Sequence, residues 1–225
     1  MKLLIMCEGP NEKEIINILL QNNCLKFTED DLLGLTPYHA RQIHSSAQVR
    51  TELNLYPGEV KIYRIGDKQS DKLKIPAEYK SKIISVEKYC TKPELEMLFI
   101  IAEQLTGAYE KVKSGMKPKD FAKANIKLGK KKYDNSTAFY TEYFGNNPAL
   151  LVRCINDYKK YNTNKLSIMN ITSHQNVVGG YKNSILYRLH IPPPFSLTFS
   201  LPHSILKSND LRNGGNILCQ NLLQN

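Results

Sequence analysis

The chain opens with an unbroken apolar run, residues 3–7, which a Gly-Pro pair ends soon afterwards. A run of this length without polar interruption is typical of a strand buried on both faces of a parallel sheet. The next segment, residues 11–23, has a broad apolar face, and Asn11 with Glu14 three residues later predicts a capped helix start. Strand, tight turn and helix in this order predict the opening of an α/β unit.

Further elements follow in the same half of the chain. A helix and two strands of alternating pattern are predicted over residues 45–55, 60–65 and 82–89. Ser45 or Ser46 would cap the helix. A T-x-x-E capping box with an early proline, residues 91–94, predicts another helix whose apolar side chains to Leu105 share one face. We therefore expect an α/β fold with a mostly parallel sheet flanked by helices.

The remaining chain changes character twice. Residues 106–161 are rich in lysine and end in a predicted helix from residue 150, so we expect a basic helical extension of the α/β domain of residues 1–105. Residues 162–225 are rich in Asn and Ser, contain two Gly-Gly pairs and a triple proline, and have little periodicity. Such a composition predicts a loosely structured tail, in which we place no chemistry.

Charge narrows the range of partners. The 225 residues carry a formal net charge of +10, and a surface this basic attracts polyanions, of which nucleic acid is the commonest. No apolar stretch is long enough for a membrane span, and the opening run is too short for a signal-peptide core. The five cysteines are scattered without a C-x-x-C pair, which argues against a zinc site and suits a reducing compartment. We therefore expect a soluble, cytoplasmic protein that does not bind membranes.

Lysines and aromatic residues alternate in the basic segment. The lysines that we single out as candidate nucleic-acid contacts are Lys117, Lys119, Lys123, Lys130, Lys131 and Lys132. The aromatic residues near them are Phe121, Tyr133, Phe139, Tyr140, Tyr143 and Phe144. Lysines bind phosphates with little regard to sequence, and exposed rings can stack on bases. The alternative is a solvated face whose tyrosines and phenylalanines belong to the core.

Glu8 is the first candidate for chemistry. It comes directly after the opening strand, and ligands of open α/β sheets bind beside the carboxyl ends of the strands. The turn after it lacks the glycine spacing and the G-K-[ST] ending of a phosphate-binding loop, so the carboxylate itself is the candidate group. The alternative is a solvent-facing carboxylate that stabilises the start of the helix. Motifs of serine hydrolases, NTPases and dehydrogenases are also missing, which disfavours those classes.

Other carboxylates follow the later strands. Asp67 and Asp71 stand in the loop G-D-K-Q-S-D after the second strand, where they can hold Mg²⁺ or simply form a polar turn. Glu94 and Glu96 open the helix after the third strand. Glu94 is already explained as a capping-box residue, whereas Glu96 is less accounted for.

The segment LLIMCEGPNEKEIINILL, residues 3–20, resembles the opening motif of TOPRIM domains. These occur in topoisomerases, primases and the small nucleases of the overcoming-lysogenisation-defect, RloB-like and AbiL-type phage-defence groups. Glu8 matches the glutamate of that motif, and Asp67 follows the strand that should carry the aspartates. KYCTKPELEMLFII, residues 88–101, looks similar to the region after the metal motif. The resemblance covers residues 1–105 and implies a TOPRIM-like sheet.

The loop G-D-K-Q-S-D departs from the D-x-D motif of that family. Asp71 would replace the second aspartate, or Glu94 or Glu96 would complete the site. On this resemblance we expect a metal-dependent endonuclease for DNA or RNA in bacterial phage defence. Glu8 would be its general acid/base, and Asp67 and Asp71 would bind Mg²⁺, with Mn²⁺ as the alternative. The runner-up is a non-catalytic nucleic-acid-binding or regulatory subunit, and a third reading is a toxin-like subunit held inactive by an ATPase partner.

Overall fold

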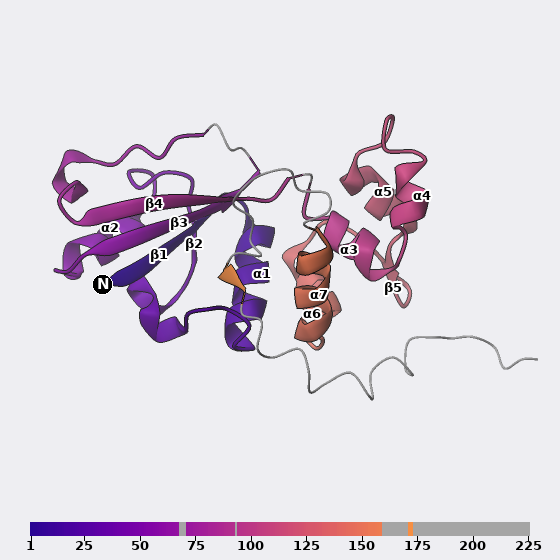
Figure 1. Cartoon of the computed structure of the whole chain (residues 1–225), viewed down its shortest axis with the longest axis horizontal. Helices are drawn as coiled ribbons and strands as arrows, with labels where there is room; N and C mark the ends of the chain where they lie inside the picture. The colour runs from indigo at the N-terminus through magenta and orange to yellow at the C-terminus, as the bar shows by residue number, and fades with distance from the viewer. Residues whose placement is uncertain (68–70, 93, 159–170, 173–225) are drawn as a thin grey trace, which may run out of the picture. The chain divides into compact units, whose positions relative to one another are not determined.

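Four parallel strands form the main sheet, in the order β2-β1-β3-β4 (Figure 1). They are β1 (Lys2–Cys7), β2 (Tyr38–His39), β3 (Val60–Gly66) and β4 (Ile83–Cys90). The computed structural model describes residues 1–67, 71–92, 94–158, 171 and 172, which all belong to the unit Met1–Ile185. The opening strand is interior, between β2 and β3, as its apolar run predicts.

Both faces of β1 are covered. Leu3, Ile5 and Cys7 join the hydrophobic cluster that contains the apolar side chains of the first helix, α1 (Pro10–Gln21). Leu4 and Met6 join a second cluster with side chains of α2 (Ala47–Leu55). Because alternate side chains of a strand point to opposite faces, an unbroken apolar run is what two-sided cover requires. The predicted α/β fold with a parallel sheet and flanking helices is thus confirmed.

The other helices follow β4 in the chain. They are α3 (Met97–Ala102), α4 (Thr106–Glu110), α5 (Pro118–Asn125), α6 (Thr137–Phe144) and α7 (Pro148–Tyr158). Short 3₁₀ turns in the described part of the chain include η1 (Glu29–Asp31), η2 (Leu33–Leu35) and η3 (Ala77–Tyr79). A hairpin of β5 (Lys127–Leu128) and β6 (Lys131–Lys132) separates α5 from α6. None of the helices in the described part of the chain has the length and apolar character of a membrane span.

Of the two predicted capping residues for α1 and α2, the first is wrong and the second is confirmed. Helix α1 begins at Pro10 with Gly9 as N-cap and no side-chain cap, so Asn11 is not the capping residue. A proline suits the first helical position because its missing N–H would have no partner there. The predicted cap Ser46 is confirmed for α2, since its hydroxyl accepts a hydrogen bond from the Val49 N–H.

The capping box at residues 91–94 does not start a helix. The Thr91 N–H continues the ladder of β4 by donating to the carbonyl of Gly66, so the chain is still extended there. Helix α3 begins six residues later at Met97, and the Glu94 carboxylate accepts a hydrogen bond from the Lys119 N–H instead of closing the box (3.1 Å). Strand pairing has overridden a local helix signal.

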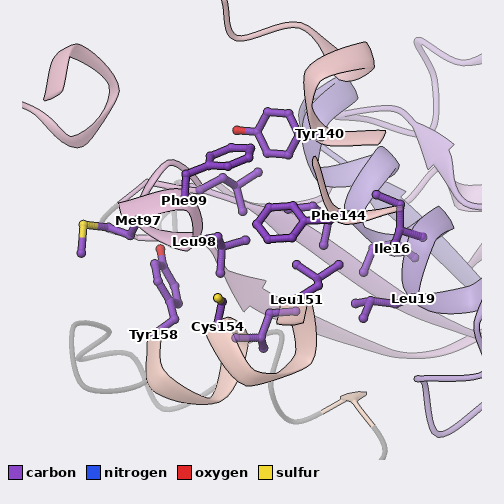
Figure 2. Close-up of a cluster of buried hydrophobic side chains, with 14 of the residues drawn as sticks. Ile16, Leu19, Met97, Leu98, Phe99, Tyr140, Phe144, Leu151, Cys154 and Tyr158 are labelled. Atoms are coloured by element: carbon purple, nitrogen blue, oxygen red, sulfur yellow. The ribbon is translucent and has the colours of Figure 1, made fainter. Parts of the chain in front are cut away.

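Helices α1, α3, α6 and α7 enclose a shared core (Figure 2). Phe99 of α3 lies within it, with ring centroids 4.8 Å from Tyr140 and 5.0 Å from Phe144. The six aromatic residues singled out above in the basic segment are all buried, none more than 5% exposed. Their interpretation as surfaces for stacking bases is therefore wrong, and the core alternative holds.

The end of the chain is described only in part. The predicted final helix is present as α7, up to Tyr158, whose hydroxyl donates to the Thr91 carbonyl (2.6 Å). Residues 159–161 of that prediction lie outside the described residues. So does the predicted tail, residues 162–225, apart from residues 171 and 172.

Candidate functional site

A cavity of about 250 Å³ lies where β1, β3 and β4 end and α1 begins. Its acidic lining residues are Glu8, Glu12, Asp67, Glu94 and Glu96, and its cationic ones are Arg41 and Lys119. The carboxyl ends of parallel strands meet at one edge of a sheet, and residues just after them converge there. Four of the five carboxylates predicted from the sequence are thus brought together, and Asp71 is the exception.

Glu8 is buried, with 6% of its surface exposed, so the solvent-facing alternative is wrong. Its Oε1 accepts from Lys88 Nζ at 3.0 Å and lies 3.4 Å from a terminal nitrogen of Arg64. Gly66 leaves the room for this carboxylate, since a Cβ at that position would lie 2.1 Å from Glu8 Cδ. The Arg41 Nε donates to the main-chain oxygen of Glu8 (3.4 Å), so the turn is held as well.

Asp71 shares Arg64 with Glu8. Its Oδ2 is 3.1 Å from the same terminal nitrogen of Arg64 that faces Glu8, and its carbonyl accepts from the other at 2.7 Å. Arg64 is 2% exposed, so a buried guanidinium contacts both carboxylates. Asp71 does not line the cavity, whereas Asp67 does. The Cys90 thiol donates to the Asp67 carbonyl (3.6 Å) and ties the ends of β3 and β4 together.

Glu12, which the sequence interpretation missed, is the carboxylate to which most of the others are electrostatically coupled. Burial raises its pKa, and the nearby charges of Asp67, Glu8 and Glu96 raise it further. A signal was present in the sequence. Glu12 stands four residues after Glu8, in the first turn of α1, and the first turn of a helix that follows a strand lies over the same sheet edge.

Glu96 occupies the other side of the cavity. Burial raises its pKa, and the Tyr133 hydroxyl donates to its Oε1 at 2.9 Å. The Tyr133 hydroxyl is also 3.2 Å from that of Tyr140, which lines the cavity. The sequence interpretation treated both tyrosines only as ring systems, because a hydroxyl's partner at this distance along the chain cannot be seen in a local pattern.

The candidate lysines divide into three kinds. Lys119 lines the cavity. Lys131 pairs with Glu142, at 2.9 and 3.1 Å from its two oxygens. The four exposed ones are Lys117, Lys123, Lys130 and Lys132.

The donors of the cavity are hard oxygens, which are the ligands of Mg²⁺ and Mn²⁺ rather than of softer metals. No three His, Cys, Asp or Glu side chains in the described residues are grouped closely enough to hold an ion between them. Mg²⁺ is commonly bound through one or two carboxylates, with water and substrate phosphate completing its coordination. The cavity fits Mg²⁺ on those terms. Of the predicted metal set, Glu8 and Asp67 line this cavity, whereas the Asp71 carboxylate contacts Arg64 instead.

Comparison with protein-family models, with curated proteins and with solved structures finds no match for this chain. The similarity of residues 3–20 to TOPRIM domains therefore stays a prediction.

Proposed function

We propose that the chain is a divalent-cation-dependent nuclease with a TOPRIM-like fold, and that the acidic cavity is its active site. The observation that carries the proposal is the convergence of five carboxylates with Arg41 and Lys119 in one cavity at the carboxyl edge of a parallel sheet. Carboxylates suit a divalent cation, and the two cationic side chains suit a phosphate. Metal-assisted phosphodiester cleavage places a divalent cation beside the scissile phosphate, and this cavity offers partners for both.

Glu8 is the general base of this proposal. A general base must hold a fixed position beside the attacking water, and the Glu8 carboxylate is held by Lys88 and Arg64 against Gly66. Those two cations compensate its charge without blocking the cavity, which it still lines. A general acid/base contributes roughly a hundred- to ten-thousand-fold in rate.

Asp67 and Glu12 would hold the cation, joined by Glu94 or Glu96. Both line the cavity, and the charge of Asp67 is among those that raise the pKa of Glu12, which supports this pair. A bound Mg²⁺ or Mn²⁺ would polarise the scissile phosphate. Asp71 takes a different part in this proposal. It holds Arg64, and through Arg64 it fixes Glu8.

The basic segment, residues 106–161, is the polyanion-binding extension in this proposal. Lys119 would meet the phosphate at the cavity, and the exposed Lys130 and Lys132 would bind the strand beyond it. The net charge of +10 supports nucleic acid, DNA or RNA, as the substrate class. The TOPRIM resemblance adds phage defence in the bacterial cytoplasm, and regulation by an ATPase partner remains the third reading.

One observation favours a second candidate. Glu8 is ion-paired to both Lys88 and Arg64, as a buried structural carboxylate would be. A non-catalytic nucleic-acid-binding subunit would keep this network for stability alone. Cleavage assays separate the two candidates.

The test is cleavage of labelled single- and double-stranded DNA and of RNA, with Mg²⁺, with Mn²⁺ and with EDTA. Glu8→Gln keeps the size of the side chain but removes its ability to take a proton. We expect it to lose roughly a hundred- to ten-thousand-fold in rate while it still folds and binds. Asp67→Asn should lose activity that high Mn²⁺ partly restores. Glu78→Gln, at an exposed carboxylate in η3, is the control and should cleave as the wild type does.

Equal cleavage by Glu8→Gln and the wild type would contradict the mechanism. Cleavage that persists in EDTA would contradict the cation requirement. A wild-type protein that binds all three substrates but cuts none of them would favour the second candidate.

A further inference from the structure

Asn135 lies where three segments of the candidate site meet. It precedes α6 in the turn Asp134–Ser136, in which Asp134 Oδ1 accepts from the N–H of Ser136 at 2.9 Å and from its hydroxyl at 2.6 Å. Its backbone has a φ of +63°, in the left-handed region that few residues other than glycine adopt. Asparagine tolerates this region better than most side chains. A local device therefore presents the Asn135 side chain to the site.

The main chain of Asn135 is tied to α1. The Asn11 side-chain amide donates to the Asn135 carbonyl at 3.2 Å, across 124 residues of sequence. Asn11 lies in the first turn of α1, between Glu8 and Glu12, and it lines the same cavity. The turn before α6 is thereby fixed relative to the carboxylates that follow β1.

The side chain of Asn135 touches one anion and one cation of the cavity. With its oxygen facing Lys119, the Asn135 amide accepts from Lys119 Nζ at 3.1 Å and its nitrogen donates to Glu96 Oε1 at 3.1 Å, while the same nitrogen faces the Asn11 amide nitrogen at 3.1 Å. The Tyr133 hydroxyl lies 2.8 Å from the same amide and 2.9 Å from Glu96. A neutral group thus stands between a carboxylate and an ammonium group that face one cavity.

We propose that Asn135 is a positioning residue, which holds the Lys119 ammonium ready for a substrate phosphate and keeps it apart from Glu96. This inference rests on the proposed nuclease function. An ammonium group on a flexible four-carbon stem moves readily toward a buried carboxylate. The amide gives Lys119 a neutral acceptor and gives Glu96 a neutral donor, so that neither charge is neutralised by the other. The Lys119 ammonium group then stays available to a substrate phosphate.

Two substitutions separate positioning from backbone geometry. Asn135→Ala removes the amide and leaves a side chain in the left-handed region, whereas Asn135→Gly removes the amide and adopts that region freely. If Asn135 matters only for the turn, the glycine variant should behave as the wild type does. If it positions Lys119, both variants should lose the same contact with the substrate.

The measurement is the affinity for a labelled single-stranded oligonucleotide, DNA and RNA, as a function of KCl concentration in EDTA. The loss of one phosphate contact lowers the log–log slope by about 0.7 on a single strand. We expect this loss in Asn135→Gly, Asn135→Ala and Lys119→Met alike. The double variant Asn135→Gly/Lys119→Met should lose no more than either single one, because residues that act as one unit are not additive.

A wild-type slope in Asn135→Gly or in Lys119→Met would overturn the inference, and so would losses that add in the double variant. The binding assay contains no divalent cation and involves no cleavage, so its outcome is independent of the test on Glu8. The expected slopes together with full cleavage by Glu8→Gln would overturn the proposed mechanism alone. A wild-type protein that binds neither oligonucleotide would overturn the inference and the proposed substrate class together.

Discussion

Glu8 owes its position to three neighbours, each of which contributes something different. Lys88 and Arg64 supply charge at 3.0 and 3.4 Å, and Gly66 supplies space. Burying a carboxylate is costly unless the group is paired, so the two cations make the buried position possible. The glycine is required by contact rather than by backbone conformation, since its φ is not in the left-handed region.

Gly66→Ala tests that requirement. The new Cβ would lie 2.1 Å from Glu8 Cδ, so the carboxylate must leave Lys88 and Arg64 or the strands must shift. Overpacking of this kind costs about 1–3 kcal/mol of unfolding free energy, and the melting temperature should fall by several degrees. Gly107→Ala is the matched control, because nothing lies within 4 Å of its Cβ. Thermal melts showing the same change in both variants would contradict this account of Glu8.

The residues of the candidate site that come directly after predicted strands could be predicted from the sequence. Glu8 and Asp67 come directly after strands, and parallel topology brings such residues to one edge. The position of the Asp71 side chain could not be predicted. Its place in the loop after β3 indicates that it lies near the edge of the sheet, but not in which direction the side chain points. Arg64 was hidden inside a strand pattern, where the sequence shows a polar position but not the two carboxylates that it joins.

At the scale of elements, the periodic sequence patterns predicted the strands β1 and β3 correctly. They missed the start of α3, which depends on pairing with a distant segment. The unbroken run of β1 and the alternation in β3 each extend over several residues, so a single exception cannot change the pattern. The start of α3 depended on four residues, and pairing between Thr91 and Gly66 outweighed them. The aromatic residues of the basic segment could equally be interpreted as base-stacking surfaces or as core residues, because a sequence shows which rings are present but not which way they point.

The β5–β6 hairpin is the element on which the polyanion contact can be tested. Lys130 and Lys132 are exposed, whereas Lys131 is paired with Glu142 and lies 5.9 Å from the centre of the Phe139 ring. The double variant Lys130→Ala/Lys132→Ala should therefore lose up to about 1.8 units of log–log salt slope on duplex DNA. Lys131→Ala should lose less, because its charge is already compensated.

Fluorescence anisotropy across a KCl series measures both slopes. A wild-type slope in the double variant would show that the hairpin is a solvated surface. A larger loss in Lys131→Ala than in the double variant would contradict the division that the ion pair suggests.

At the scale of the whole molecule, the candidate site is acidic although the chain as a whole is basic. The chain carries a net charge of +10, yet five carboxylates line one cavity. Like charges held together cost stability unless a proton or a cation enters among them. A basic surface with an acidic cavity is what a nuclease needs if the surface gathers the polyanion and the cavity admits a divalent cation.

The stability that the fold loses by holding these carboxylates together depends on pH, and the sign of this dependence can be derived. Burial raises the pKa of Glu12 and of Glu96 in the folded state, so folding favours their protonated forms. Each group contributes stability that is fully present below its unfolded pKa of about 4.3 and is lost as the pH rises through its folded pKa. Above that folded pKa, both groups are ionised in both states, and the folded state bears the repulsion.

A divalent cation should restore the stability that is lost when Glu12 and Glu96 ionise. This effect should become larger as the pH rises. It binds the ionised carboxylates of the folded chain, and at a hundred times its Kd a ligand stabilises a fold by about 2.7 kcal/mol. We expect the rise in melting temperature on adding Mg²⁺ or Mn²⁺ to grow from pH 5 to pH 8, measured against KCl of equal ionic strength. Glu12→Gln should be more stable than the wild type in EDTA at pH 8, because it removes one of the crowded charges, and it should gain less from the cation. A cation effect that is the same at every pH, or the same in Glu12→Gln, would show that the cation binds somewhere other than the cavity.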